Sequence, residues 1–257
     1  MSSPVPQQGM WIIGYGSLIF KPPPHVSFKL TGYLKGFIRR FWQSSNDHRG
    51  TPKSPGRVVT LVSLSDLKRY DKFHSDLHMY ELSKTHQETD LSQEGETTSS
   101  EILDITHHIS QLTEEDLKVW GVAYYIAPEN VQYVKEYLDI REQNGYSTHL
   151  VPFHILNIES VESSPSTSIM NELSQDEKTG DYYIESMIYI GTIDNEAFVG
   201  PESIEDTAKV IKTSQGPSGT NVEYLQLLTN AVRGLDPRIH DYYLEDLCKL
   251  IDIPSLT

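Results

Sequence analysis

The sequence contains almost no cysteine: Cys248 is the single one among 257 residues. One thiol cannot form a disulfide within the chain, nor can it supply a cysteine cluster for zinc. A reducing compartment, the cytoplasm or the nucleus, is therefore expected. The histidines provide no H-E-x-x-H motif, so no metal site is predicted.

The chain also lacks long apolar runs and an excess of positive charge. No stretch approaches the roughly 18 apolar residues of a membrane span, and the N-terminus has no region typical of a signal peptide. With 36 acidic residues against 21 basic ones, the formal net charge is −15. Because this charge repels nucleic acids and anionic membranes, neither is expected as a partner. No oligomeric state is predicted.

The negative charge is concentrated in two stretches, residues 71–117 and 157–181. They carry net charges of −10 and −5, and the remaining 185 residues are neutral overall. Both stretches are rich in Ser, Thr, Gln and Glu, a composition that buries too little apolar surface to offset the entropy of ordering. The sequence therefore predicts a single domain over residues 1–257, interrupted by flexible acidic insertions at about 71–117 and 157–181.

Short runs rich in Val, Ile, Tyr and Trp predict strands at Met10–Tyr15, Val58–Leu64, Val119–Ile126, His149–Leu156 and Met187–Ile190, with a further candidate at Tyr33–Trp42. Helical spacing predicts helices at about 131–138, 202–212, after Ser218, and 241–251. Strands come first and helices are massed at the C-terminus. This order indicates an α+β fold, a small mixed or antiparallel β-sheet or barrel with flanking helices.

The first segment with chemical potential is Gly14-Tyr15-Gly16-Ser17-Leu18-Ile19, directly after the first predicted strand. Two glycines around an aromatic residue allow a tight turn whose backbone N–H groups converge, a geometry that binds a carboxylate or a developing oxyanion. The segment matches neither a phosphate-binding loop nor a G-x-S-x-G elbow. A plain strand end is the alternative interpretation.

The second segment is the end of the helix predicted at 131–138, where Arg141 and Glu142 precede Asn144-Gly145. A carboxylate there faces the negative end of the helix dipole, which raises its pKa and makes it a better base near neutral pH. The alternative is that Arg141 and Glu142 form a solvated helix end.

The third segment, residues 48–57, contains two prolines and two glycines together with Arg49, Lys53 and Arg57. Its stiffness and positive charge are typical of a clamp for a small anion. The alternative is that these cations neutralise the acidic insertions.

Together, these segments resemble the ChaC family of glutathione-specific γ-glutamylcyclotransferases. The resemblance covers nearly the whole neutral part of the chain, and the fungal members are the most similar. It is carried by Met10–Ile19, Phe41–Pro52, Trp120–Tyr125, Tyr137–Glu142, Tyr189–Gly191, Ile193–Pro201 and Gly216–Gly219.

This resemblance implies a small mixed β-barrel with flanking helices and a lyase that needs no cofactor. The implied reaction converts reduced glutathione to 5-oxoproline and Cys-Gly. The turn from Gly14 to Ile19 would hold the γ-glutamyl group, and Glu142 would be the catalytic acid/base. Arg49 and Arg57 are candidates for the glycine carboxylate of the substrate.

Three other functions stay open at this point. One is a cyclotransferase that acts on other γ-glutamyl amino acids or amines. Another is a sensor that binds glutathione without cleaving it. The third is a scaffold whose acidic insertions bind a basic partner.

Overall fold

A computed structural model of the chain describes residues 8–82, 107–142, 145–156, 172–177 and 179–253. Five strands form a closed barrel in the order β1-β5-β2-β6-β8, and a pairing between β1 and β8 closes it. The β1–β8 pairing is parallel and the others are antiparallel, so the barrel is mixed. Its strands are β1 (Met10–Gly14), β2 (Val26–Lys35), β5 (Lys118–Ile126), β6 (Ser147–Ile155) and β8 (Tyr182–Ile190).

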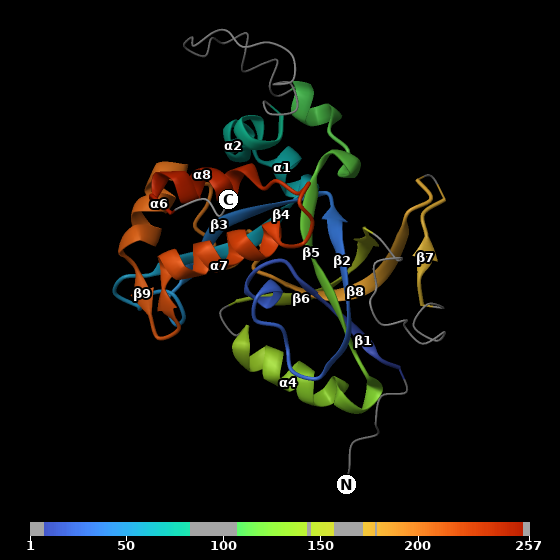
Figure 1. Cartoon of the computed structure of the whole chain (residues 1–257). Helices are drawn as coiled ribbons and strands as arrows, with labels where there is room; N and C mark the ends of the chain where they lie inside the picture. Colours follow the sequence, from blue (N-terminus) through green and yellow to red (C-terminus); the bar gives the residue numbers. More distant parts are fainter. Residues whose placement is uncertain (1–7, 83–106, 143–144, 157–171, 178, 254–257) are drawn as a thin grey trace.

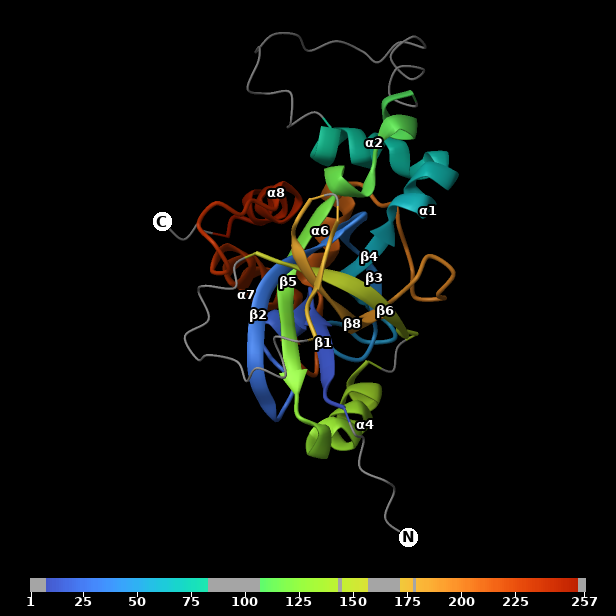
Figure 2. The same ribbon diagram turned by 90° about the vertical axis from the view of Figure 1, so that its right-hand side faces the viewer.

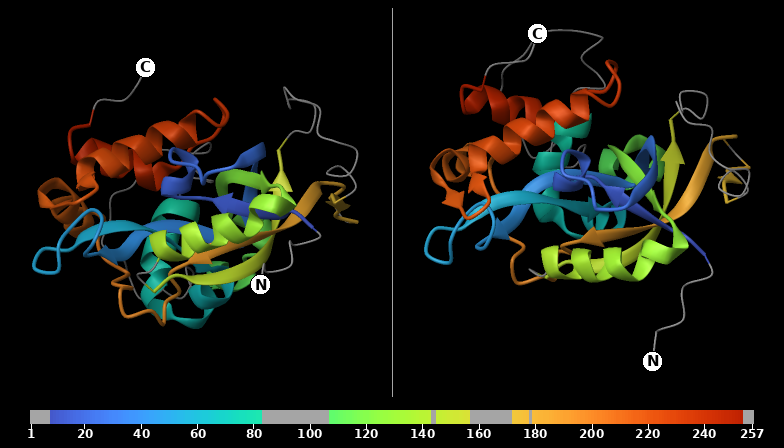
Figure 3. Two further views of the ribbon diagram at one scale, coloured as in Figure 1. Left: turned by 90° about the horizontal axis from the view of Figure 1, so that it is seen from below. Right: turned by 60° about the horizontal axis from the view of Figure 1, so that its bottom comes forward.

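The remaining strands lie outside the closed barrel. A short strand, β7 (Ser174–Gln175), extends the sheet beside β8, while β3 (Phe37–Ser45) pairs with β4 (Gly56–Ser63) in a separate sheet. A further hairpin joins β9 (Gln215–Gly216) to β10 (Gly219–Thr220). The loop between β3 and β4 projects beside this hairpin (Figure 3), and the Ser218 N–H donates to the His48 carbonyl oxygen at 2.9 Å.

The helices surround the barrel on one flank and at both ends. Figures 1 and 2 show α6, α7 and α8 gathered on the flank, α4 at one end, and α1 and α2 at the other. Their bounds are α1 (Leu64–Arg69), α2 (His74–Leu77), α4 (Val131–Arg141), α6 (Ile204–Thr213), α7 (Asn221–Arg233) and α8 (Tyr242–Leu250). Within the described ranges, no helix has the length and apolar character that a bilayer crossing requires.

Three clusters of buried apolar side chains hold these layers together. The largest joins the barrel to α6, α7 and α8. A second packs Val131, Val134 and Leu138 of α4 against β1 and β5. A third lies between the β3–β4 sheet and the helical segments around α1 and α2. The second cluster matters most for function, because it holds the C-terminal end of α4 near the end of β1.

The predicted α+β barrel with flanking helices is confirmed, including three helices in the C-terminal part of the chain. The candidate strand Tyr33–Trp42 differs from the structure, because this range crosses from β2 to β3. Gly36 lies between the two strands with a φ of +73°, a conformation that glycine adopts without strain. The chain therefore turns where the sequence pattern looks continuous.

The edges of the first predicted insertion belong to the compact unit. Phe73, Leu77 and Ile109 are almost completely buried in the third cluster. Arg40 of β3 also forms ion pairs with Asp76 and Glu81. When composition is averaged over the whole acidic stretch, these apolar positions at its ends do not stand out as core residues. Residues 83–106 lie outside the described part.

The second predicted insertion also has a described edge. The β7 strand pairs with β8, and the Trp11 Nε1–H donates to the Glu172 carboxylate at 2.9 Å. The acidic insertion predicted at 157–181 thus includes a segment that adds to the sheet. Residues 157–171 lie outside the described part.

Candidate active site

The glycine-rich segment after β1 forms a tight turn that continues into a single 3-10 turn, Ser17–Ile19. The Ile19 N–H donates to the Gly16 carbonyl oxygen at 3.0 Å, and the Tyr124 hydroxyl donates to the Leu18 carbonyl oxygen at 2.8 Å. A Cβ atom on Gly16 would lie 2.9 Å from Val59 Cγ2. The φ of Gly16 is −123°, so a positive φ is not the reason for a glycine at this position. The reason is the close approach of Val59.

Glu142 follows α4 immediately, and its N–H caps the helix by donating to the Leu138 carbonyl oxygen at 2.8 Å. Its side chain is only 16% exposed. The neighbouring Arg141 joins this helix end to the turn. Its Nη2 donates to Ser17 Oγ at 2.9 Å, its Nη1 donates to the Lys21 carbonyl oxygen at 2.9 Å, and its Nε lies 3.5 Å from Glu142 Oε1. The two segments that the sequence singled out are thus in direct contact.

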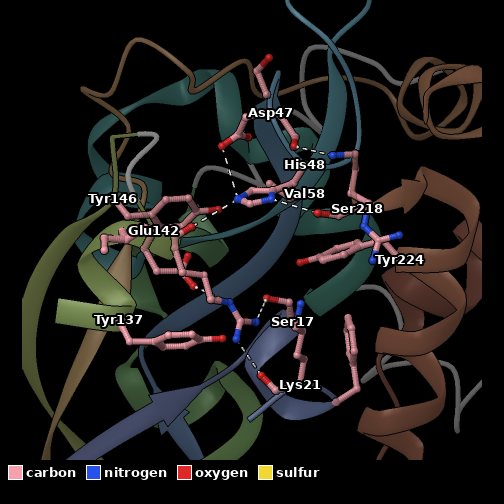
Figure 4. A pocket seen from close by; sticks show the side chains of 16 residues that line it. Ser17, Lys21, Asp47, His48, Val58, Tyr137, Glu142, Tyr146, Ser218 and Tyr224 are labelled. Atoms are coloured by element: carbon pink, nitrogen blue, oxygen red, sulfur yellow. Dashed lines mark hydrogen bonds and ion pairs between the residues drawn. The ribbon is translucent and has the colours of Figure 1, made fainter. Parts of the chain in front are cut away.

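A cavity of about 350 Å³ opens between the turn, the β3–β4 loop, the end of α4 and α7. Figure 4 shows Glu142 and Tyr146 on one side of it and Ser218 and Tyr224 on the other. A smaller chamber of about 40 Å³ is lined by the turn and by the barrel. Four residues line both spaces: Ser17, Glu142, Tyr146 and Tyr224. Glu142 therefore stands where the outer cavity meets the inner chamber.

Burial raises the pKa of the Glu142 carboxyl group, because it removes water from the charged form. The interactions of the carboxyl group with Arg141 and His48 lower this pKa, and the negative charge of Asp47 adds to the rise. From the sequence, the helix dipole was the predicted cause of a raised pKa for Glu142. In the structure burial is the main cause, so this glutamate is a poorly hydrated carboxyl group suited to accept a proton.

Four tyrosine side chains line the inner chamber: Tyr15, Tyr146, Tyr189 and Tyr224. Burial raises the pKa of each hydroxyl, and the nearby Glu142 carboxylate adds to the rise. These hydroxyls are therefore neutral at physiological pH. The sequence reasoning assigned no role to Tyr146, Tyr189 or Tyr224. They come from distant elements, and no spacing along the chain connects them.

The structure separates the two arginines that were candidates for substrate binding. Arg49 lines the outer cavity, where its Nη1 also lies 2.6 Å from the Glu223 carboxylate. Arg57 makes a two-point ion pair with Glu202, with distances of 2.7 and 2.6 Å, and it lines neither space. The ion pair with Glu202 thus holds Arg57 outside the site. The spacing along the sequence did not indicate this ion pair.

His48 is a further cavity residue to which the sequence reasoning gave no role. Its Nδ1 lies 3.2 Å from Ser218 Oγ, and its Nε2 lies 3.4 Å from an Asp47 carboxylate oxygen and 3.3 Å from the Arg141 carbonyl oxygen. In the described part of the chain, no group of three or more His, Cys, Asp or Glu side chains could hold a metal ion.

Comparison with known proteins adds to this geometry. The family model for ChaC-like proteins matches residues 10–253. The chain belongs to the ChaC-like protein family. ChaC-like relatives include a glutathione-specific γ-glutamylcyclotransferase of Saccharomyces cerevisiae, which is 41% identical over 95% of this chain and 96% of its own length. The enzyme of the same name from Schizosaccharomyces pombe is 30% identical over 94% of this chain and 92% of its own length.

A solved structure agrees with this assignment. The crystal structure of a yeast γ-glutamylcyclotransferase specific to glutathione superposes on this ChaC-like chain with a TM-score of 0.78 and 40% sequence identity. The superposition covers 96% of both chains. The barrel and its flanking helices are thus the fold of a γ-glutamylcyclotransferase.

Proposed function

We propose that this chain is a single-domain lyase that degrades reduced glutathione to 5-oxoproline and Cys-Gly. One observation carries the proposal: the largely buried Glu142 carboxyl group stands beside the glycine turn, at the junction of the two spaces. The names and the extensive coverage of the yeast relatives support glutathione as the substrate. The buried Cys248 is compatible with the reducing conditions of the cytoplasm or the nucleus.

The reaction is an intramolecular aminolysis that needs no protein nucleophile. The α-amine of the γ-glutamyl group attacks its own γ-carbonyl carbon, closes a five-membered lactam and expels the cysteinyl nitrogen. The turn from Gly14 to Ile19 and the inner chamber would hold the γ-glutamyl arm in its folded conformation. Such proximity removes several kcal/mol from an activation barrier.

Glu142 would transfer the protons. The carboxylate first accepts a proton from the α-ammonium group, which frees the nitrogen lone pair for attack. When the tetrahedral intermediate collapses, the protonated Glu142 donates to the leaving nitrogen. The attacking nitrogen goes from an ammonium group to a lactam N–H and the leaving nitrogen goes from an amide N–H to an ammonium group, so Glu142 carries a proton between them twice and ends as it began. General acid–base catalysis of this kind is worth roughly 10²- to 10⁴-fold.

The outer cavity is the space for the Cys-Gly half of the substrate. Its wall includes the cationic side chains of Lys21 and Arg49, together with His48. These groups are suited to the glycine carboxylate. Arg57, which is held by Glu202 away from the cavity, has no part in this proposal.

The test is to incubate the purified protein with reduced glutathione and to follow 5-oxoproline and Cys-Gly by mass spectrometry. Both products should accumulate in equal amounts. A parallel panel of γ-glutamyl amino acids and γ-glutamylamines tests specificity, and preferred turnover of one of these would redirect the assignment. Calorimetric binding of glutathione without product release would instead indicate a sensor.

A further inference from the structure

A second arginine, which is buried inside the protein, holds the backbone of the glycine turn by a hydrogen bond. The side chain of Arg39, on β3, is only 1% exposed. Its Nη1 donates to the Tyr15 carbonyl oxygen at 2.7 Å and to the Trp120 carbonyl oxygen at 3.0 Å. Its Nε and Nη2 donate to Asp241 Oδ2 at 3.0 and 2.7 Å. The guanidinium group thus fastens the turn to β5 and to the start of α8.

The carbonyl group of Tyr15 belongs to the same peptide unit as the N–H of Gly16. This peptide bond is trans, since the one cis bond recorded for the described residues is Gly200–Pro201. In a planar trans peptide the C=O and N–H bonds point in opposite directions. With its oxygen held by Arg39, this unit directs the Gly16 N–H away from the buried guanidinium. Gly16 itself lines the inner chamber.

The Gly16 N–H is available for a ligand. None of the recorded hydrogen bonds of the described residues uses it as a donor, although the Gly16 carbonyl oxygen accepts from Ile19. A cation on the carbonyl oxygen of an amide also withdraws electron density from its nitrogen, which makes the N–H a stronger donor. Arg39 can therefore both aim this donor and strengthen it.

We propose that Arg39 is a positioning residue for the reaction, which directs the Gly16 N–H toward the negative charge that develops in the inner chamber. Asp241 holds the guanidinium group in place from the other side. The inference rests on the proposed function, because it assigns the Gly16 N–H to the substrate of that site. Arg39 acts through the backbone of the turn and is not itself a catalytic residue.

The next residue on β3 provides a matched control. Arg40 is as deeply buried as Arg39, but it makes its ion pairs with Asp76 and Glu81 and lines neither of the two spaces of the site. Substitution of either arginine by lysine keeps the charge and loses the planar fork of donors. Both variants should lose stability. Only Arg39→Lys should also disturb the turn.

We expect Arg39→Lys to lower kcat/KM by at least about tenfold, less than the 10²- to 10³-fold lost when such a donor is removed outright. Arg40→Lys should remain within about twofold of the wild type once both proteins are assayed below their melting temperatures. Asp241→Asn is the milder second variant. The Asp241 side chain caps α8 by accepting from the Leu244 N–H, and asparagine keeps that cap, so this variant should fold. Its kcat/KM should also fall below that of the wild type.

A measurement without turnover separates this inference from the proposed function. The ¹⁵N resonance of the Gly16 amide reports the polarisation of its peptide unit, and it should shift in Arg39→Lys and Asp241→Asn but not in Arg40→Lys. An unmoved Gly16 signal, or equal losses of kcat/KM in Arg39→Lys and Arg40→Lys, would overturn the role of Arg39. A wild type that releases no 5-oxoproline would refute the proposed function, and the Gly16 signal would still test the Arg39 geometry.

Discussion

Arg141 Nη2 donates a hydrogen bond to Ser17 Oγ at 2.9 Å, across 124 positions of sequence. This bond joins the end of α4 to the turn after β1. The same guanidinium group lies beside the Glu142 carboxylate, with its Nε 3.5 Å from Oε1. One side chain thus fixes the distance between the proposed base and the turn that would hold its substrate.

The pH dependence of turnover follows from the environment of Glu142. The base must be ionised, and burial raises its pKa above the ordinary value of 4.5. The acidic limb of kcat/KM should therefore lie above pH 4.5. Because the charge of Asp47 contributes to the rise, Asp47→Asn should move this limb to lower pH. A limb that moves to higher pH in this variant would contradict the assignment of Glu142 as the base.

Gly16→Val should weaken the binding of glutathione. The new Cβ atom would lie 2.9 Å from Val59 Cγ2 and 3.3 Å from the Tyr224 hydroxyl oxygen, so the turn must shift. Overpacking of this kind costs about 1–3 kcal/mol. We expect a raised Michaelis constant. Gly234→Ala is the control, since its Cβ would meet no atom closer than 3.3 Å and Gly234 lines neither space. An unchanged Michaelis constant in Gly16→Val would count against the turn as the binding site.

The two arginines Arg49 and Arg57 should respond differently to substitution by glutamine. Arg49→Gln removes a cation from the wall of the outer cavity and should raise the Michaelis constant for glutathione. Arg57→Gln breaks the partly buried pair with Glu202 and should cost about 1–3 kcal/mol of stability with the Michaelis constant unchanged. Steady-state kinetics and thermal denaturation of both variants check this. If Arg57→Gln raises the Michaelis constant more than Arg49→Gln does, the placement of the Cys-Gly half is wrong.

Stability measurements alone can test whether the edge of the first acidic stretch packs in the core. Leu77 is fully buried, and Leu77→Ala should lower the free energy of unfolding by about 2–5 kcal/mol. Ser75 is exposed two positions earlier, so Ser75→Ala should change it by less than about 0.5 kcal/mol. Equal denaturation midpoints for the two variants would show that this segment does not belong to the core.

The sequence predicted β1, β5 and β6 of the barrel well, because each is a short run of β-branched and aromatic residues between turn residues. It located only the C-terminal part of β8 and missed most of β2. It also placed a helix after Ser218, and α7 begins there at Asn221, with the Thr220 side chain accepting from the Glu223 N–H at 3.1 Å. The prediction failed where composition was averaged over a long stretch. Phe73 and Leu77 are buried core residues inside a segment whose net charge suggested an insertion.

For the candidate site, the sequence pointed to the turn and to Glu142, because each is a local pattern with a chemical consequence, and residues of both line one chamber. Their roles in the reaction stay a prediction. The sequence did not supply what depends on tertiary contact. Tyr224 reaches the cavity from α7, and Arg57 is held by Glu202, 145 positions away. The pairing of Arg39 with Asp241 spans 202 positions. No spacing rule connects such residues, so only the folded chain shows which cations face the cavity and which support it.

Product release by Glu142→Gln tests directly whether Glu142 transfers the protons of the reaction. Glutamine keeps the shape of the side chain but cannot accept the proton, so turnover should fall by roughly 10²- to 10⁴-fold while calorimetry still detects glutathione binding. Because burial raises the pKa of Glu142, its ionised form destabilises the folded protein at neutral pH, and the variant should melt at the same temperature as the wild type or higher.

Glu136→Gln is the matched control, since Glu136 is exposed on α4 and lines neither space. Its release of 5-oxoproline and Cys-Gly, followed by mass spectrometry, should equal that of the wild type. If Glu142 transfers the protons, both products should be almost completely lost in Glu142→Gln alone. Near-normal release of Cys-Gly by the folded Glu142→Gln variant would contradict this role of Glu142.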